Sequence, residues 1–231
     1  MPFSEFLGNE RIVTALGGAL RSGRVPHAML FSGPAGVGKF TLARLFAAAA
    51  NCEKLTDDSC GECDTCKRIS LLADPQRLIE QGLAERGESA DAATVERIPL
   101  ILQSHPDVWA LVPDPVRLKN PVARPVLRIG QIRAAQRAAY FQPMARRRVF
   151  IFDGADTMRW EVQNVLLKIL EEPPGTVTNP YCAVAVFFAA DHFVSLHAVS
   201  LRAARDIGGG ANPQRKIGQI SVTNSPGSAT L

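Results

Sequence analysis

The feature that most constrains the fold of this chain is a glycine-rich segment between a short apolar run and a helix-forming run. The apolar run is Ala28-Met29-Leu30-Phe31, the helix-forming run covers residues 42–50, and the segment between them is Gly33, Pro34, Ala35, Gly36, Val37, Gly38, Lys39, Phe40 and Thr41. A strand, a tight turn and a helix start bring backbone N–H groups and the positive end of the helix dipole to one small site, which suits an anion. Glycines let the backbone curl around phosphate oxygens, and Lys39 can reach the β- and γ-phosphates. The sequence therefore predicts an α/β fold with a P-loop.

One position departs from the P-loop pattern. Phe40 stands where a serine or threonine would hold Mg²⁺, and the hydroxyl arrives one residue later, at Thr41. This substitution favours binding of a nucleotide phosphate, such as that of ATP, over magnesium-assisted hydrolysis. A glycine-rich turn that binds nothing is the alternative interpretation.

Four of the five cysteines lie within fifteen residues, directly after the helix that follows the P-loop. Cys52, Cys60, Cys63 and Cys66 have the spacing C-x7-C-x2-C-x2-C. Two CxxC steps let thiolates of one turn converge on a tetrahedral ion, and Cys52 completes the four ligands. The pattern predicts a closed, structural zinc site, whereas free thiols or a redox pair are the alternative.

A second apolar run ends in a carboxylate. Residues 149–152 are Val-Phe-Ile-Phe, and Asp153 follows them, which is typical of the Walker B strand whose aspartate orients Mg²⁺ beside the P-loop. The next residue, usually a glutamate that activates water, is Gly154, and Asp156 comes two places later. We therefore assign no catalytic residue and expect the chain's own ATPase activity to be weak or absent.

Composition narrows the class of protein further. The chain has 231 residues, of which 46% are hydrophobic, so it can bury one core, or one core and a small annex. Its net charge of +4 permits contact with nucleic acid without requiring it. Glu5, Glu10 and Arg11 do not fit a signal peptide, and no apolar run reaches the ~18 residues of a membrane span, so we expect a cytoplasmic protein without membrane contact.

Together these motifs carry a family resemblance. A P-loop, a helix and a Cys₄ module inserted directly after it resemble the AAA+ subunits of the bacterial clamp loader, namely the gamma/tau and delta-prime subunits of DNA polymerase III. Residues 162–174, which end in Leu-Glu-Glu-Pro-Pro, resemble the most recognisable stretch of that family. The resemblance implies an AAA+ parallel sheet flanked by helices, with the zinc module inserted. Asp153-Gly154 resembles the delta-prime version more than the gamma/tau version, which keeps the glutamate.

The expected organisation is a nucleotide-binding domain over residues 1–190 and a divergent, disordered tail over 191–231. Within the domain we expect the zinc module at 52–68, a helical surface insertion at 71–104 and a strand near 183–188. We therefore expect the lid and collar domains of the family to be missing from this chain. Residues 190–195, read one nucleotide later, can encode the family's Pro-Thr-Ile-x-Ser-Arg motif, so we also consider a frameshift after Pro174, which the underlying DNA would test.

The resemblance also implies a function. A delta-prime subunit belongs to the DNA-directed DNA polymerase III holoenzyme, a nucleotidyltransferase complex, and helps to load the sliding clamp on primed DNA during replication. Its partners would be the gamma/tau and delta subunits, the clamp indirectly, and primed DNA through Arg128, Arg133 and Arg137, which otherwise form a solvated basic face. The alternatives are a gamma/tau-type ATPase and a free-standing P-loop ATPase of DNA repair.

Overall fold

The computed structural model describes residues 2–26, 28–87, 91–116, 124–171, 184–189 and 198–200. In chain order the elements are η1 (Phe3–Glu5), α1 (Glu10–Arg21), β1 (Ala28–Ser32), α2 (Lys39–Asn51), α3 (Asp64–Ser70), η2 (Leu71–Ala73), α4 (Pro75–Arg86), α5 (Ala92–Arg97), β2 (Leu102–His105), β3 (Val108–Leu111), α6 (Ile129–Ala139), β4 (Val149–Phe152), η3 (Ala155–Thr157), α7 (Trp160–Glu171), β5 (Val184–Ala189) and β6 (Ala198–Ser200). Within the tail over 191–231, where we predict disorder, residues 198–200 form β6 and pair with β1, so the prediction is wrong for these residues. The rest of that tail lies outside the described residues.

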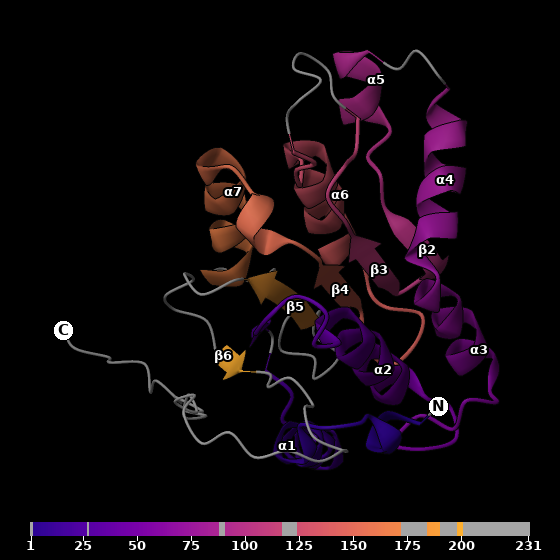
Figure 1. Cartoon of the computed structure of the whole chain (residues 1–231). Helices are drawn as coiled ribbons and strands as arrows, with labels where there is room; N and C mark the ends of the chain where they lie inside the picture. The colour runs from indigo at the N-terminus through magenta and orange to yellow at the C-terminus, as the bar shows by residue number, and fades with distance from the viewer. Residues whose placement is uncertain are drawn as a thin grey trace, which may run out of the picture.

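Within the part of the chain that the structure describes, six strands form one sheet in the order β2-β3-β4-β5-β1-β6 (Figure 1). β3, β4, β5, β1 and β6 pair in parallel, whereas β2 pairs with β3 in the antiparallel sense. The prediction of a parallel sheet is therefore wrong at this edge, and the sheet is mixed. β2 and β3 are joined by the two-residue turn Pro106-Asp107, and so short a connection can only reverse the chain.

The prediction of a helical insertion over residues 71–104 is wrong at its end, where the chain enters the same edge of the sheet. Residues 71–104 do contain η2, α4 and α5, but the last three residues belong to β2. Leu100 and Leu102 are both buried, and Leu102 lies opposite Ala110 of β3. The alternation of buried and exposed side chains near the end of the insertion is the signal of this strand.

Side chains alternate between the two faces of the central strands and build two cores. Met29 and Phe31 of β1 join the core formed with α1, α2 and α3, whereas Ala28 and Leu30 join the core formed with α6 and α7. In β4, Val149 and Ile151 likewise join the first of these cores, and Phe150 and Phe152 join the second. The sheet is thus covered by helices on both faces, as the apolar runs of parallel strands require (Figure 1).

A buried ion pair joins the beginnings of β3 and β4. Asp107 is fully buried and accepts hydrogen bonds from Arg148 (Nη2–Oδ1 2.8 Å) and from the backbone N–H of Ala145 (2.7 Å). Arg148 also donates to the carbonyl oxygens of Ala138, in the last turn of α6, and of Phe141, just beyond that helix. One charged pair therefore fixes the α6–β4 connection on the sheet.

No helix in the described part of the chain is long and apolar enough to cross a membrane.

Candidate functional site

The predicted P-loop follows the carboxyl end of β1 and leads directly into α2. Gly36 (φ 79°) and Gly38 (φ 88°) adopt the left-handed conformation that glycine tolerates best, and Gly38 is the N-cap of α2. These conformations curl the loop before the helix begins. The structure thus gives the glycines the turn that the sequence predicts for them.

Lys39 is the first residue of α2 and reaches back over its own loop. Its Nζ atom donates to the carbonyl oxygens of Gly33 (2.7 Å) and Pro34 (2.9 Å). These bonds hold the ammonium group at the loop, where a phosphate would meet both the positive charge and the helix N-terminus.

Asp153 lies near this ammonium group, although β5 separates its strand from β1 in the sheet. All three strands are parallel, so their carboxyl ends meet at one edge. Burial raises the pKa of Asp153, and the charge of Lys39 opposes that increase. The structure therefore brings together the two charged residues that the sequence assigns to the nucleotide site.

Phe40 and Thr41 occupy the first turn of α2. The Phe40 ring is half-buried and packs against the core that contains Phe3, Phe6 and Phe46. Phe40 thus contributes to packing at the position where a P-loop enzyme has a metal-binding hydroxyl.

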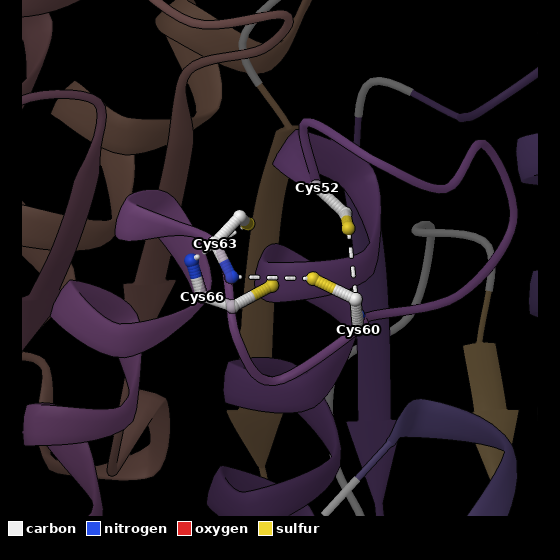
Figure 2. A group of neighbouring side chains, drawn as sticks. All are labelled: Cys52, Cys60, Cys63 and Cys66. Carbon is white, nitrogen blue, oxygen red and sulfur yellow. Dashed lines mark hydrogen bonds between the residues drawn. The ribbon is translucent and has the colours of Figure 1, made fainter.

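The four cysteines converge between the end of α2 and the start of α3 (Figure 2). Cys52 is the C-cap of α2, Cys63 is the N-cap of α3, and the four Sγ atoms all lie within 4.8 Å of one another. Tetrahedral zinc with Zn–S bonds of about 2.3 Å needs sulfurs roughly 3.8 Å apart, so small movements would complete the site. The cluster can therefore bind zinc.

Backbone N–H groups support the sulfurs of this cluster. Cys52 Sγ accepts from Leu55 and Cys60 (both 3.4 Å), Cys60 Sγ from Cys63 (3.3 Å), and Cys63 Sγ from Cys66 (3.4 Å). The bonds from the backbone of Cys63 and Glu62 lower the pKa of Cys60 to about 6. Burial instead raises the pKa of Cys66, so this thiol needs the charge of a metal ion to ionise. Such a donor set fits a soft divalent ion, and four protein ligands leave no place for substrate.

His105 lies beside this cluster but outside the group of metal-ligating residues. Its Nδ1 accepts from the Asp107 N–H (3.1 Å), its Nε2 lies 3.4 Å from Thr65 Oγ1, and burial lowers its pKa. Thr65 in turn donates to Glu53 (2.8 Å). A neutral imidazole with Nδ1 as acceptor carries its proton on Nε2, so it cannot serve as a base toward Thr65. These contacts give the histidine a structural role.

The predicted basic face divides into two parts. Arg133 and Arg137 are exposed one turn apart on α6, but Arg128 caps that helix and is largely withdrawn from solvent. Its Nε lies 3.4 Å from the fully buried Asp114, which also pairs with Arg86 at 2.7 Å. The prediction of three solvent-facing arginines is therefore wrong for Arg128, whose charge is used inside the fold.

Two residues of structural importance escape the sequence analysis. Gln131 is fully buried and donates to the carbonyl oxygens of Leu100 (2.6 Å) and Val112 (2.8 Å). Asp58, in the loop between the first two cysteines, binds the N-terminal segment. A lone polar residue in a helix or loop gives no local signal of such partners.

The chain is similar to known subunits of DNA polymerase III. A profile of the family described as "DNA polymerase III, delta subunit" matches residues 8–179. The chain is 34% identical over 176 residues to DNA polymerase III subunit tau/gamma of Haemophilus influenzae, which covers 76% of this chain and 20% of that protein. It is 31% identical to DNA polymerase III subunit tau of Escherichia coli over 76% of this chain and 21% of that protein. It is 28% identical to DNA polymerase III subunit tau of Bacillus subtilis over 86% of this chain and 27% of that protein. The chain thus spans less than a third of these relatives.

Proposed function

The chain belongs to the DNA polymerase III clamp-loader family, and on that premise we propose that it provides the AAA+ nucleotide-binding domain of a delta-prime-type subunit. In this role it binds the phosphates of a nucleotide through its P-loop and hydrolyses little or no nucleotide. It acts beside gamma/tau and delta subunits in seating the sliding clamp on primed DNA, and the cysteine cluster holds a structural zinc ion. This role would place the chain in the bacterial cytoplasm.

The observation that carries the proposal is the backbone at Gly154. This residue follows Asp153 at the position where the gamma/tau type keeps a glutamate, and its φ of 69° is left-handed. A Cβ atom there would lie 2.9 Å from Cγ of Pro113, closer than real Cβ contacts allow. The local fold therefore disfavours any side chain at this position, including a catalytic glutamate.

Three further observations support binding of a nucleotide phosphate. The P-loop glycines have the required conformations, Lys39 sits over the loop, and Asp153 lies within its electrostatic influence. The half-buried Phe40 supplies no metal ligand. Binding with little turnover follows from this combination.

The similar proteins favour a second candidate, a gamma/tau-type ATPase, because several of them are named as tau or gamma subunits. Turnover separates the two types. We expect the full chain to bind ATP and Lys39→Ala to weaken that binding at least tenfold, whereas hydrolysis stays at the level of a buffer blank. ATP turnover that Lys39→Ala abolishes would instead identify the gamma/tau type.

The third candidate, a free-standing P-loop ATPase, has a different test. If clamp-loader subunits do not co-purify with the chain, that candidate would be favoured.

Restoring the glutamate should not restore hydrolysis. We expect Gly154→Glu to lower the free energy of unfolding by about 2–4 kcal/mol, through left-handed strain and the clash with Pro113, without raising ATP turnover. Gly23 is the control, because its φ of 70° is close to that of Gly154 but nothing lies within 4 Å of its Cβ position. Gly23→Glu should therefore cost only the backbone strain, about 1 kcal/mol, in the same urea titration. Robust turnover by a stable Gly154→Glu variant would contradict the proposal.

The two exposed arginines of α6 lead to a prediction about DNA. In a reconstituted clamp loader, Arg133→Glu with Arg137→Glu should weaken binding of primed DNA and reduce the salt slope of log K by about 2. Arg11→Glu on α1 with Arg77→Glu on α4 makes the same change in net charge on two helices that pack against the other core, so this double variant is the control. Equal DNA binding by the two variants would mean that the α6 face is merely solvated.

A further inference from the structure

The candidate phosphate and metal sites lie at opposite ends of α2. Lys39 is the first residue of this helix and Cys52 is its C-cap. Thirteen residues at 1.5 Å each separate the sites by about 20 Å. A second connection runs outside the helix, through the N-terminal turn η1 and the Phe6 side chain that follows it.

The loop between Cys52 and Cys60 holds η1 in place. Oδ1 of Asp58 accepts from the backbone N–H groups of Phe3 (2.7 Å) and Ser4 (3.2 Å), and Oδ2 accepts from the Ser4 hydroxyl (2.6 Å). The buried Ser59 hydroxyl accepts a further bond from the Phe3 N–H at 3.1 Å. Both ends of this loop are cysteines of the candidate metal cluster, and residues 53–60 contain no helix or strand. Its shape therefore depends on how its ends are held.

The segment that begins with η1 also contacts the phosphate loop. Phe3 is buried against Phe46 of α2, with ring centroids 6.1 Å apart. Phe6 is buried too, and its ring covers Gly38 so closely that an added Cβ would lie 3.1 Å from Cζ and 3.3 Å from Cε2. Phe6 thus packs on the left-handed residue that turns the P-loop into α2.

We propose that Asp58 and Phe6 are positioning residues for the phosphate loop, through which metal binding at the cysteine cluster and nucleotide binding at the P-loop strengthen each other. This inference rests on the proposed function, because it requires that the P-loop bind nucleotide and that the cysteines bind zinc.

The physical basis is preorganisation. A metal ion bound by all four thiolates fixes both ends of the 53–59 loop, so Asp58 holds η1 and Phe6 stays packed on Gly38. Backbone N–H groups that already point at the phosphate need less ordering when it binds. Coupling of this kind is reciprocal, so nucleotide must stabilise the bound metal by the same factor, and factors of about 5–150 are typical.

The first measurement is a titration of the full chain with magnesium-free ATP. We expect about tenfold weaker binding after a zinc-selective chelator has removed the metal. The zinc-loaded Asp58→Ala variant should show a similar loss while it keeps about one zinc per chain. Asp57→Ala is the matched control, because Asp57 lies in the same loop but pairs with Arg21 of α1 at 2.8 Å rather than with η1. It should bind ATP as the parent does.

The second measurement uses the reciprocal effect. In the parent and Asp57→Ala proteins, saturating ATP should lower the equilibrium constant for transfer of zinc from the protein to a chelator by about tenfold. ATP should no longer affect zinc transfer in Asp58→Ala and Phe6→Ala. If these residues had only a structural role, the effect of ATP on zinc transfer would remain. Ser4→Ala, which removes only the hydroxyl bond to Asp58, gives a milder test if either variant folds poorly.

The outcomes separate this inference from the proposed function. If the zinc-loaded parent does not bind ATP, both fail. If the parent binds ATP equally well with and without zinc, or if Asp58→Ala behaves like Asp57→Ala in both measurements, the coupling through η1 is wrong and the proposed function stands.

Discussion

Replacement of Cys63 by serine is expected to reduce the zinc content of the purified chain from about one ion to near zero and to lower its stability by several kcal/mol. Cys63 holds a central place in the cluster. Its N–H donates to Cys60 Sγ (3.3 Å), and its own sulfur caps α3 by accepting from Cys66 N (3.4 Å). A serine hydroxyl is a poor zinc ligand, so the variant would lose the metal. Serine is also a good N-cap and keeps the backbone N–H that donates to Cys60 Sγ, so the loss of stability would come from the lost metal rather than from a lost cap.

Elemental analysis and thermal unfolding would measure these effects. Cys182→Ser provides the control, since it makes the same chemical change at the one cysteine that lies outside the cluster in the sequence. Zinc content equal to that of the parent in the Cys63→Ser variant would show that the cluster does not bind the ion.

Replacement of Asp107 by alanine is expected to lower the free energy of unfolding by about 3–5 kcal/mol. The carboxylate is fully buried and accepts from Arg148 at 2.8 Å, so its removal leaves a charged guanidinium group with only 10% of its side chain exposed and no counterion there. The Ala145 N–H loses its acceptor as well. Urea unfolding monitored by circular dichroism would measure the change.

An exposed ion pair supplies the comparison for this variant. Lys54 and Glu62 lie 3.1 Å apart with most of both side chains in solvent, so Glu62→Ala should leave stability close to that of the parent. A similarly small effect of Asp107→Ala would mean that water reaches Arg148 and that the pair does not hold the α6–β4 connection.

The motifs that are contiguous in the chain could be predicted from sequence. The turn at Gly36 and Gly38, the convergence of four cysteines within fifteen residues and the carboxylate after a buried strand each depend on spacing over a few residues. The backbone geometry of a turn, a helix cap or a strand end dictates such arrangements locally. The strand at 184–189 was predictable for the same reason, from its continuous apolar run.

Contacts between distant segments could not be predicted in this way. Arg128, Arg133 and Arg137 look alike in the sequence, and only the fold brings Asp114 beside the first of them. Likewise, nothing near Gly154 in the chain indicates that Pro113 closes the space for a side chain. Pro113 meets Gly154 because β3 and β4 lie side by side in the sheet, and Asp114 meets Arg128 beside the bridge between Asp114 and Val126. These contacts decide which charges remain exposed to solvent and which side chains fit.

The sequence by itself therefore determined the glycine-rich turn before α2 and the convergence of the four cysteines, since each of these candidate sites is built mainly from one short stretch whose spacing sets its geometry. The tertiary structure alone decided how the two sites are connected, because Asp58 reaches the N-terminal turn across 54 and 55 residues of chain and Phe6 meets Gly38 only after α2 has packed on the sheet. Packing of segments far apart in the chain creates such contacts, and no local pattern encodes them.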